Sequence, residues 1–435
     1  MYVPINSNIV PIGTFFLIHD AELCLIKKLK NRIMKSLSTQ KTERQYFIDW
    51  LRIFLIFSVF VFHIGMFFNT WDWHVKNPTE YGGLLKNVMI FLGKWRMPLL
   101  FLISGAGTYY ALGKRTTGKY LGERFKRLMI PLIAGIFILV PVQVYLEKAD
   151  QYNSLLSFYP HMFEGIYPSG NFSWHHLWFI AYLFIISLFF SPFLKLFRSN
   201  GYLRFSIWLE GFAARRLSLN AAVIILVVSQ VLLRPYFPED THGLVNDWAA
   251  MAYYIIFFLA GFILLSNKNI IESIRKQKNL YLAEAALASA MMFSSPHIFL
   301  DESTADLVWG ISSIFLAWSC GLAAIGYARQ YLNHDSTFRK VANEAIYPFY
   351  LLHQPVILII GFFLIKWEMP DFARFLLLII SSFGITCAMY WFLVRPFSIT
   401  RVIFGMKPLR PRTEQALVTE NLELIPEIIA ERKVG

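Results

Sequence analysis

Three side chains in the first long apolar stretch of the chain have types suited to acid–base and ionic chemistry. They are Asp49, Arg52 and His63, within Y-F-I-D-W-L-R-I-F-L-I-F-S-V-F-V-F-H. An α-helix turns about 100° per residue, so the eleven positions from Arg52 to His63 leave both within about 20° of one face and about 16 Å apart along the axis. Asp49 falls on the same side. Such a stripe on an apolar helix is expected to face a cavity or the interior of a helical bundle.

His63 is a candidate general base, because histidine exchanges a proton near neutral pH and could accept one from a hydroxyl group. A buried histidine bonded to a neighbouring carbonyl group is the alternative, and the residue alone does not decide between them. The next apolar stretch holds Lys94 and Arg96 in K-W-R-M-P-L-L-F-L-I-S-G. These cations could bind an anionic thioester or a developing oxyanion. Extension to the membrane interface is the alternative, which suits Lys94 better than Arg96.

Small and basic residues follow in the same region. Ser104 precedes Gly105, and this pair predicts close approach of another helix, with catalysis by Ser104 as the lesser alternative. Arg124 and Arg127 are three residues apart in Y-L-G-E-R-F-K-R and would share a helix face. A phosphate-rich ligand such as coenzyme A would suit them. Charges that set the topology or bind anionic lipid are the alternative.

Two later motifs contain histidine. His176 and Trp178 lie in H-H-L-W-F, where no matching carboxylate or cysteine spacing accompanies the His-His pair, so no metal site is expected. Tyr350 and His353 share a face in Y-P-F-Y-L-L-H-Q-P, and Pro355 would allow the helix to bend. These four residues are candidates for acceptor binding or for structural roles.

The composition indicates that these residues lie in membrane helices. The chain has 435 residues, of which 56% are hydrophobic, 17% aromatic and 16% charged. A soluble domain carries about 25% charged residues. The formal net charge is +13, but the basic residues alternate with apolar stretches instead of forming one patch, which argues against a nucleic-acid partner. The long apolar runs lack period-two alternation and therefore predict helices.

The fold expected from this pattern is an all-α polytopic membrane bundle of about ten transmembrane helices. Most of the 41 basic residues lie in alternate connecting segments, which by the positive-inside rule places both termini in the cytoplasm. The opposite loops are rich in aromatic residues, which suit either sugar faces or a membrane interface. The expected spans are approximately 47–69, 88–112, 128–146, 176–196, 219–234, 248–266, 280–296, 304–327, 345–365 and 373–394.

The chain divides on this basis into three parts. Residues 1–45 form a cytoplasmic N-terminal segment, 46–397 the membrane domain, and 398–435 a charged cytoplasmic tail. The N-terminal segment lacks the flanking charges of a secretory signal. Translation that begins at Met34 would make the preceding residues an extension of the natural protein.

Taken in order, these motifs resemble the acyltransferase 3 family of integral membrane acyltransferases. The similarity covers nearly all of the chain from Tyr46 to Phe397. Its most specific part is the Arg-x10-His spacing of Arg52 and His63, preceded by the D-x-L-R opening at Asp49. The R-M-P-L-L-F-L-I-S-G stretch, the R-x-x-R pair and the Y-P-F-Y-L-L-H-Q-P segment also resemble the family.

The resemblance implies an enzyme that transfers an acyl group, acetyl or succinyl, from acyl-CoA to a hydroxyl group of a glucan or other cell-envelope carbohydrate. It implies a multi-pass protein of the bacterial inner (plasma) membrane that uses acyl-CoA as cosubstrate without a bound cofactor. Its partners would be acyl-CoA, the carbohydrate acceptor and membrane lipid, with no nucleic acid. His63, with Asp49 and Arg52, would carry catalysis; Arg96, Arg124, Arg127 and Ser104 would hold the donor.

Two other classes of function stay open at the level of sequence. A secondary transporter or a flippase of a glycan or lipid-linked precursor also has many helices and buried charges, but repeated halves are not visible. A membrane scaffold would not need inward-facing histidine and arginine. Release of free coenzyme A thiol distinguishes an acyltransferase from both.

Overall fold

The computed structural model describes residues 44–112, 116–238 and 241–409. By its internal contacts the chain divides into Met1–Gln45 and Tyr46–Gly435, and every helix of the described residues belongs to the second unit. Within the described ranges the secondary structure is helical and contains no strand, which confirms the prediction of an all-α fold. The hypothesis of a start at Met34 lies outside the described residues.

Seven helical segments of the described chain are long and apolar enough to cross a membrane. Because a helix rises about 1.5 Å per residue, each reaches or approaches the roughly 30 Å of a hydrocarbon core. The integral, multi-pass nature of the protein is therefore confirmed. The segments are α2 (Tyr46–Phe68), α3 (Gly83–Leu112), Thr117–Glu147, His175–Phe193, α13 (Glu302–Tyr331), α14 (Thr337–Leu364) and Asp371–Val394.

The described residues give seven to nine spans where about ten were expected. Two helix pairs qualify only when joined, and each is sharply bent: α9 (Asn200–Ala213) meets α10 (Ala221–Leu233) at 118°, and α11 (Trp248–Leu264) meets α12 (Lys268–Ile298) at 108°. The described structure thus has seven spans, or nine if each bent pair counts as one. The 13 residues of α10 extend only about 20 Å and are too short to span alone, whereas the 31 residues of α12 are long enough but not apolar enough.

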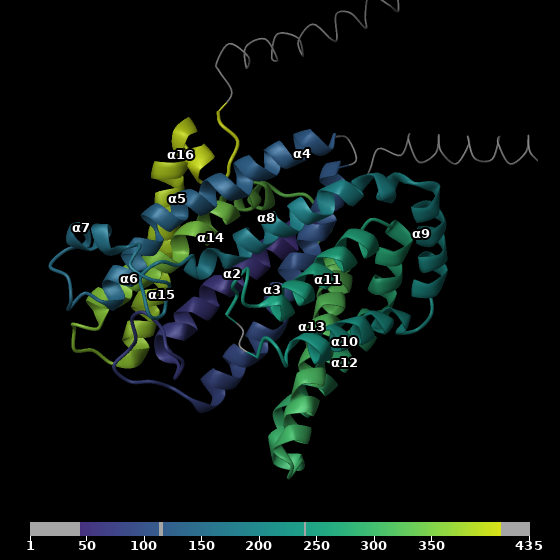
Figure 1. Ribbon diagram of the computed structural model, residues 1–435, viewed down its shortest axis with the longest axis horizontal. Coiled ribbons are helices and arrows are strands. Elements are labelled where there is room, and N and C mark those ends of the chain that lie inside the picture. The colour runs from purple at the N-terminus through teal and green to yellow at the C-terminus, as the bar shows by residue number, and fades with distance from the viewer. Residues whose placement is uncertain (1–43, 113–115, 239–240, 410–435) are drawn as a thin grey trace, which may run out of the picture. The chain divides into compact units, whose positions relative to one another are not determined.

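Shorter elements complete two of these segments and the connections. The Thr117–Glu147 segment contains a π-helix, η1, between two α-helices, and α16 lies beside α5 at the top of Figure 1. The elements are α4 (Thr117–Arg124), η1 (Phe125–Met129), α5 (Ile130–Ile138), α6 (Val140–Glu147), α7 (Leu155–Phe158), η3 (His175–Leu177), α8 (Trp178–Phe190), α15 (Asp371–Met389), η6 (Tyr390–Val394) and α16 (Ser398–Ile403).

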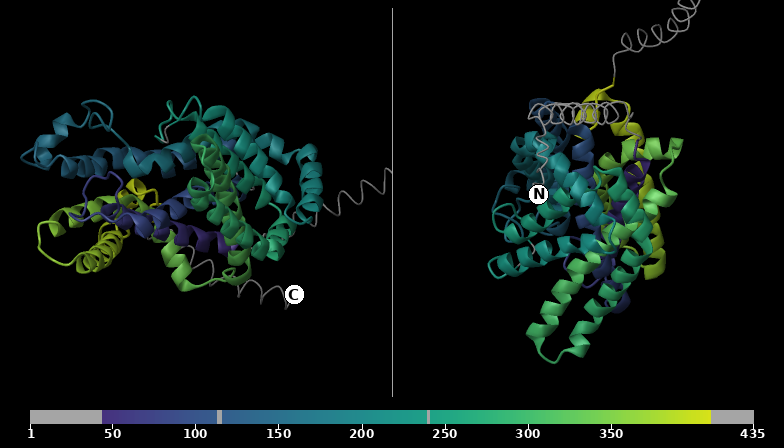
Figure 2. Two further views of the ribbon diagram at one scale, coloured as in Figure 1. Left: turned by 90° about the horizontal axis from the view of Figure 1, so that it is seen from below. Right: turned by 90° about the vertical axis from the view of Figure 1, so that its right-hand side faces the viewer.

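The helix α2 lies at the centre of the packing, between α3 and α14. The helix α3 also crosses α11. The two are so close that a Cβ atom at Gly105 would meet the backbone of Phe258, and one at Gly261 would meet the carbonyl of Leu102. Gly105 therefore has the close-packing role that its sequence context predicts. The α12–α13 pair forms a long hairpin that projects below the other helices in the right-hand view of Figure 2.

Apolar side chains cover much of the outside of these helices. On α15, for example, Ile380 is 68% exposed. In a membrane such side chains contact lipid, and the polar residues are left to the interior and the ends. The placement of both termini in the cytoplasm stays a prediction.

Candidate active site

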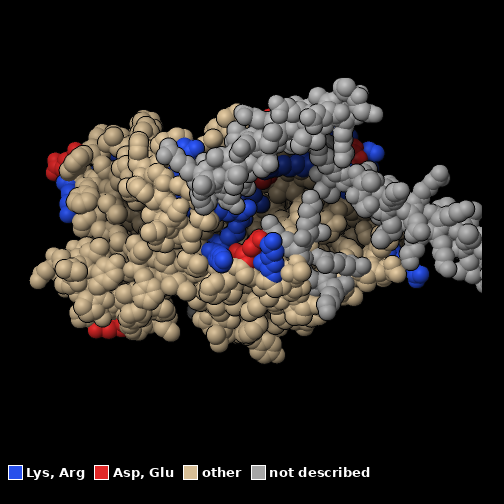
Figure 3. Space-filling view, turned by 90° about the horizontal axis from the view of Figure 1, so that it is seen from above, with Lys and Arg blue, Asp and Glu red and all other residues tan. Residues whose placement is uncertain are grey.

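A basic cavity of about 530 Å³ opens among α2, α3, α4, η1, α8 and α14. We call this the donor cavity, after the acyl donor that the sequence predicts its arginines to bind. Its cations outnumber its acids, and Figure 3 shows Lys and Arg side chains around a hollow on the face where α4 and α16 lie. Four residues predicted to act with an acyl donor, or beside it, line the cavity: Arg52, Ser104, Arg124 and Arg127. Its other charged residues are Glu123, Lys340, Glu344, Arg401 and Lys407.

The two arginines of the R-x-x-R motif reach this cavity from a helix irregularity. Arg124 ends α4, and Arg127 lies within the π-helix η1. Arg124 donates hydrogen bonds to the hydroxyl oxygens of Thr108, at 2.6 Å, and Tyr120, at 3.1 Å. A π-helix inserts an extra residue into the helical ladder and is frequent at functional sites. The irregularity aims both arginines into one cavity.

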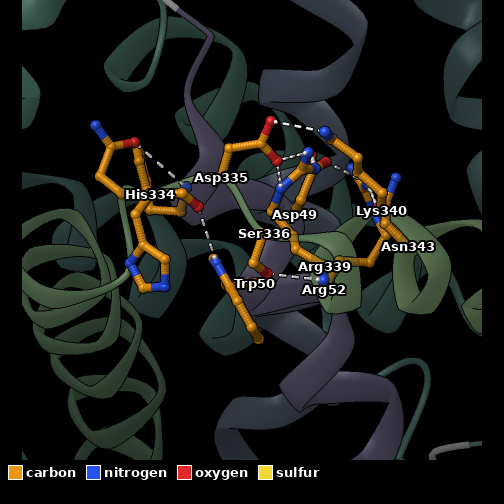
Figure 4. A network of polar contacts seen from close by, with 11 residues as sticks. Asp49, Trp50, Arg52, His334, Asp335, Ser336, Arg339, Lys340 and Asn343 are labelled. Carbon is orange, nitrogen blue, oxygen red and sulfur yellow. Dashed lines mark hydrogen bonds and ion pairs between the residues drawn. The ribbon is translucent and has the colours of Figure 1, made fainter.

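An ion-pair network joins α2 to α14 at the basic end of the donor cavity (Figure 4). Arg339 is fully buried and pairs with Asp49 and, at 2.7 Å, with Asp335. Arg52 donates to Asn343 at 3.1 Å and to Asp49 at 3.4 Å. Asp49 thus contacts both arginines, and it does not appear among the residues that line the cavity. Its position is that of a group that orients Arg52.

The opposite end of the donor cavity is apolar and aromatic. The lining residues from α3 and α8 carry no charge, and on α14 Tyr350 lies beyond Lys340 and Glu344. The hydroxyl of Tyr350 donates to the backbone carbonyl of His176. The ring centroids of Tyr350 and His353 are 5.9 Å apart, so the cavity ends one side chain away from His353.

Three of the predicted histidines come together at this end. His63 Nδ1 lies 2.8 Å from His353 Nε2, although the two residues are separated by 290 positions in the sequence. The ring centroids of His176 and His353 are 5.6 Å apart. His63 itself is absent from the lining of the donor cavity, so a ligand in the cavity reaches it only past Tyr350.

A backbone carbonyl that the proline in α14 leaves without a helical donor binds His176. Pro355 has no N–H, so the carbonyl of Leu351, four residues earlier, lacks its usual helical donor. His176 Nε2 lies 3.1 Å from that carbonyl oxygen and donates to it. The helix α14 continues through Pro355 as one element, Thr337–Leu364. The proline thus provides an acceptor for a side chain from another helix.

Arg96 is buried beside these histidines. It is 5% exposed, and its guanidinium carbon lies 3.9 Å above the ring centre of Phe62. Its Nε and Nη1 atoms have no hydrogen-bond partner among the described residues. A buried cation in this state favours an anion or a developing negative charge nearby. Lys94, in contrast, lines a second cavity and not the first.

Aromatic and acidic residues lie on the far side of His63 from the donor cavity. The Trp73 ring is parallel to that of His63, with centroids 6.1 Å apart. The neighbouring His74 contacts Glu147 at 2.5 Å, and its ring meets His175 with centroids 4.4 Å apart. Burial raises the pKa of Tyr167, whose hydroxyl donates to Glu147. This group offers aromatic faces and hydrogen-bonding atoms together.

Trp178 lies outside the histidine group. Its ring packs against Tyr254 and His242, with centroids 5.3 Å and 3.9 Å away. Among the residues that the structure describes, no three His, Cys, Asp or Glu side chains are placed to hold a metal ion.

Comparison with known proteins relates this arrangement to a family of enzymes. The chain is 24% identical to "Glucans biosynthesis protein C" of Escherichia coli (strain SMS-3-5 / SECEC) over 399 residues, which covers 85% of this chain and 96% of the relative. The protein of the same name from Escherichia coli O81 (strain ED1a) is 24% identical over 397 residues, with the same coverage. The W-D-W-H-V-K-N-P and H-H-L-W-F-I segments also resemble that protein.

The family model described as "Acyltransferase domain" matches residues 45–391, which include the histidine group and the donor cavity's lining apart from Arg401, Gly405, Met406 and Lys407. The match therefore extends over the candidate site and not only over its apolar helices. The chain belongs to the acyltransferase 3 family of integral membrane acyltransferases.

Proposed function

We propose that this membrane O-acyltransferase transfers an acetyl or succinyl group from acyl-CoA to a hydroxyl group of a glucan or another cell-envelope carbohydrate. The observation that carries the proposal is the donor cavity, which is basic at one end and closes beside the His63–His353 pair at the other. Family membership favours this enzyme over the transporter that the sequence left open.

The donor cavity suits the two ends of an acyl-CoA molecule. The phosphates of coenzyme A would bind Arg124 and Arg127, because hydrogen bonds between charged groups are stronger than those between neutral groups. The thin pantetheine arm would then run along Ser104 toward Tyr350, in the part of the cavity where the charged side chains end. Because Tyr350 separates the cavity from the histidines, the thioester would reach His63 by displacing that ring or passing its edge.

The reaction then needs one base and one site for negative charge. His63 would take the proton of the acceptor hydroxyl as its oxygen attacks the thioester carbonyl carbon. Arg96, whose Nε and Nη1 lack partners in the described structure, would stabilise the oxyanion that forms. The carbon–sulfur bond breaks, the coenzyme A thiolate leaves and receives the proton from His63, and the ester and free thiol are the products.

The acceptor would approach from the side of Trp73 and His74. A flat aromatic ring parallel to His63 offers a surface for the apolar face of a sugar. The relatives' printed name, glucans biosynthesis protein C, supports a glucan as this acceptor. In a bacterial inner membrane, with both termini on the cytoplasmic side, the basic end of the cavity would face the cytoplasm and Trp73 would face the opposite compartment.

The test is release of free thiol from acetyl-CoA and succinyl-CoA by the purified full chain in lipid, with glucan present. We expect activity in the wild type, a loss of at least about 100-fold in His63→Ala, and little change in His297→Ala, which removes an exposed histidine at the end of α12. Equal activity of His63→Ala and wild type would exclude His63 as the base. Glucan-dependent transfer from a donor without coenzyme A would overturn the assignment of the donor.

A further inference from the structure

The contact between His63 and His353 determines which nitrogen of each ring carries a proton. His353 Nδ1 lies 2.6 Å from the backbone carbonyl oxygen of Tyr350. A carbonyl oxygen only accepts hydrogen bonds, so this nitrogen is the donor and carries the proton. In the neutral ring the other nitrogen, Nε2, then bears a lone pair.

The second ring follows from the first. His353 Nε2 accepts at 2.8 Å from Nδ1 of His63, so His63 carries its proton on Nδ1. The remaining nitrogen, Nε2 of His63, is left with a lone pair and is the atom able to accept a proton. Without this partner a neutral imidazole exchanges between its two tautomers, and one of them has no lone pair on Nε2.

The position of His353 is itself restrained from several sides. Its ring is parallel to that of Phe349, with a 2° angle between the planes, and Phe60 meets it edge-on. His353 is fully buried, so no solvent competes for its two hydrogen bonds. The Tyr350 hydroxyl and the Leu351 carbonyl both bond His176, which closes the group on the remaining side.

We propose that His353 is a positioning residue that holds His63 in the Nδ1-protonated tautomer and so directs the Nε2 lone pair to the acceptor hydroxyl. This inference rests on the proposed function for its consequence in catalysis. Its role parallels that of the carboxylate in a Ser-His-Asp triad, which orients the histidine and selects its tautomer. Here the partner is a neutral imidazole backed by a carbonyl group. When His63 accepts the hydroxyl proton, His353 keeps its own and stabilises the imidazolium through the existing hydrogen bond.

Two substitutions separate positioning from packing. His353→Gln retains a side-chain oxygen that can accept from His63 Nδ1, whereas His353→Leu has similar bulk and no acceptor. We expect kcat for thiol release to fall at least about 100-fold in His353→Leu and less than about 10-fold in His353→Gln. The KM for acyl-CoA and the unfolding temperature should be alike in the two variants. Equal losses of kcat in two folded variants would overturn the proposal, as would full activity of His353→Leu.

A spectroscopic measurement tests the tautomer independently of catalysis. The chain has 10 histidines, and in protein labelled with ¹⁵N-histidine the signals absent from His63→Ala identify His63. Protonated and unprotonated ring nitrogens resonate far apart, so we expect a protonated Nδ1 in the wild type and a mixture of tautomers in His353→Leu. A protonated Nε2 in the wild type would overturn the inference even if acyl transfer is confirmed. The expected tautomer in a protein without thiol release would instead count against the proposed function alone.

Discussion

Two cavities of nearly equal volume lie in this helical bundle, and they differ in almost everything else. The donor cavity measures about 530 Å³ and the second, between α3, α10, α11 and α13, about 520 Å³. The charged residues of the second cavity are Lys94, Arg234 and Asp306. Arg234 is already engaged with Gln230 at 3.2 Å and with Asp247 at 3.4 Å. Volume therefore does not identify the site.

What distinguishes the donor cavity is the combination of excess positive charge at one end and a histidine group at the other. The two cavities also meet different stretches of α3, because Ser104 and Gly107 line the first and Gly93 and Pro98, nearer the start of the helix, line the second. Under the proposed function, the acyl donor would therefore bind in the first cavity, and the second would take no part in catalysis.

Substitutions that fill each cavity from a matched glycine should have the largest effect. Gly107 lines the donor cavity and Gly310 the second; both lie in helices, and the nearest atom to a Cβ at Gly107 is 3.7 Å away, on Arg52. We expect Gly107→Leu to reduce kcat/KM for acyl-CoA at least about 100-fold, because displacement of a reacting group by about 1 Å already has effects of that size. Steady-state thiol release measures it.

The control is Gly310→Leu, around whose Cβ position the described structure leaves open space within 4 Å. A leucine improves helix propensity by roughly 1 kcal/mol at either site, so both variants should fold. Loss of activity in Gly310→Leu with full activity in Gly107→Leu would exchange the roles of the two cavities.

The sequence predicted the cations of the donor cavity better than the shape that joins them. The sequence indicated Arg52, Arg124 and Arg127 because they are charged residues in or beside apolar spans. Burial of such a charge costs free energy, so its presence indicates a functional role. The π-helix that presents Arg127 has no sequence signature, because it depends on how α4 and α5 pack. The proximity of His63 and His353 likewise arises from the packing of α2 on α14, which no local pattern encodes.

Other residues at the site carried weaker signals. Arg339 and Asn343 lie four residues apart on α14 and so share a face toward α2, but a basic residue at a helix start is also typical of topology signals. Hydrophobicity predicted the spans 248–266 and 280–296 one by one, but it does not reveal that α11 and α12 are bent by 108° at their junction. Single helices were thus predictable, and their angles were not.

The next largest effect concerns the charge at the basic end. Arg127→Ala should raise the KM for acyl-CoA by about 10- to 100-fold with little change in kcat, since a hydrogen bond to a charged group contributes about 1.5–3 kcal/mol. The matched control is Lys126→Ala, which removes an exposed cation from the same π-helix outside the cavity lining. A KM that rises equally in both variants would mean that general attraction of anions, and not the cavity, accounts for the effect.

A smaller effect on catalysis should follow from loss of the acids that anchor the two cavity walls. Asp49 pairs with Arg339 and Arg52 near the donor cavity; Asp247 pairs with Arg234 and caps α11 through Ala250 at 2.9 Å near the second. Removal of one partner from a buried pair costs about 3–5 kcal/mol. Asp49→Ala and Asp247→Ala should therefore both lower the unfolding temperature. Only Asp49→Ala should also raise the KM for acyl-CoA, by about 10-fold, because Arg52 loses its orientation.

Thermal unfolding and initial rates on the folded fraction separate the two effects. If Asp247→Ala changed the KM as much as Asp49→Ala, the second cavity would contribute to donor binding and the comparison would be lost. If Asp49→Ala instead abolished kcat with an unchanged KM, Asp49 would act in the chemical step as the family resemblance allows.

The smallest expected effect is a loss of stability at acid pH, caused by protonation of Asp335 near the donor cavity. Hydrogen bonds from Arg339, and more weakly from Lys340, lower the pKa of Asp335 below its ordinary value of about 3.9. A carboxylate with a lowered folded-state pKa stabilises the protein above the unfolded-state pKa, and this stabilisation is lost as the pH falls through the folded-state value. The wild type should therefore unfold at a higher temperature than Asp335→Asn at pH 7, by roughly 1–3 °C, with the difference shrinking toward pH 3. A difference that grows on acidification would mean that Asp335 is stabilised as the neutral acid, which the pairing with Arg339 does not allow.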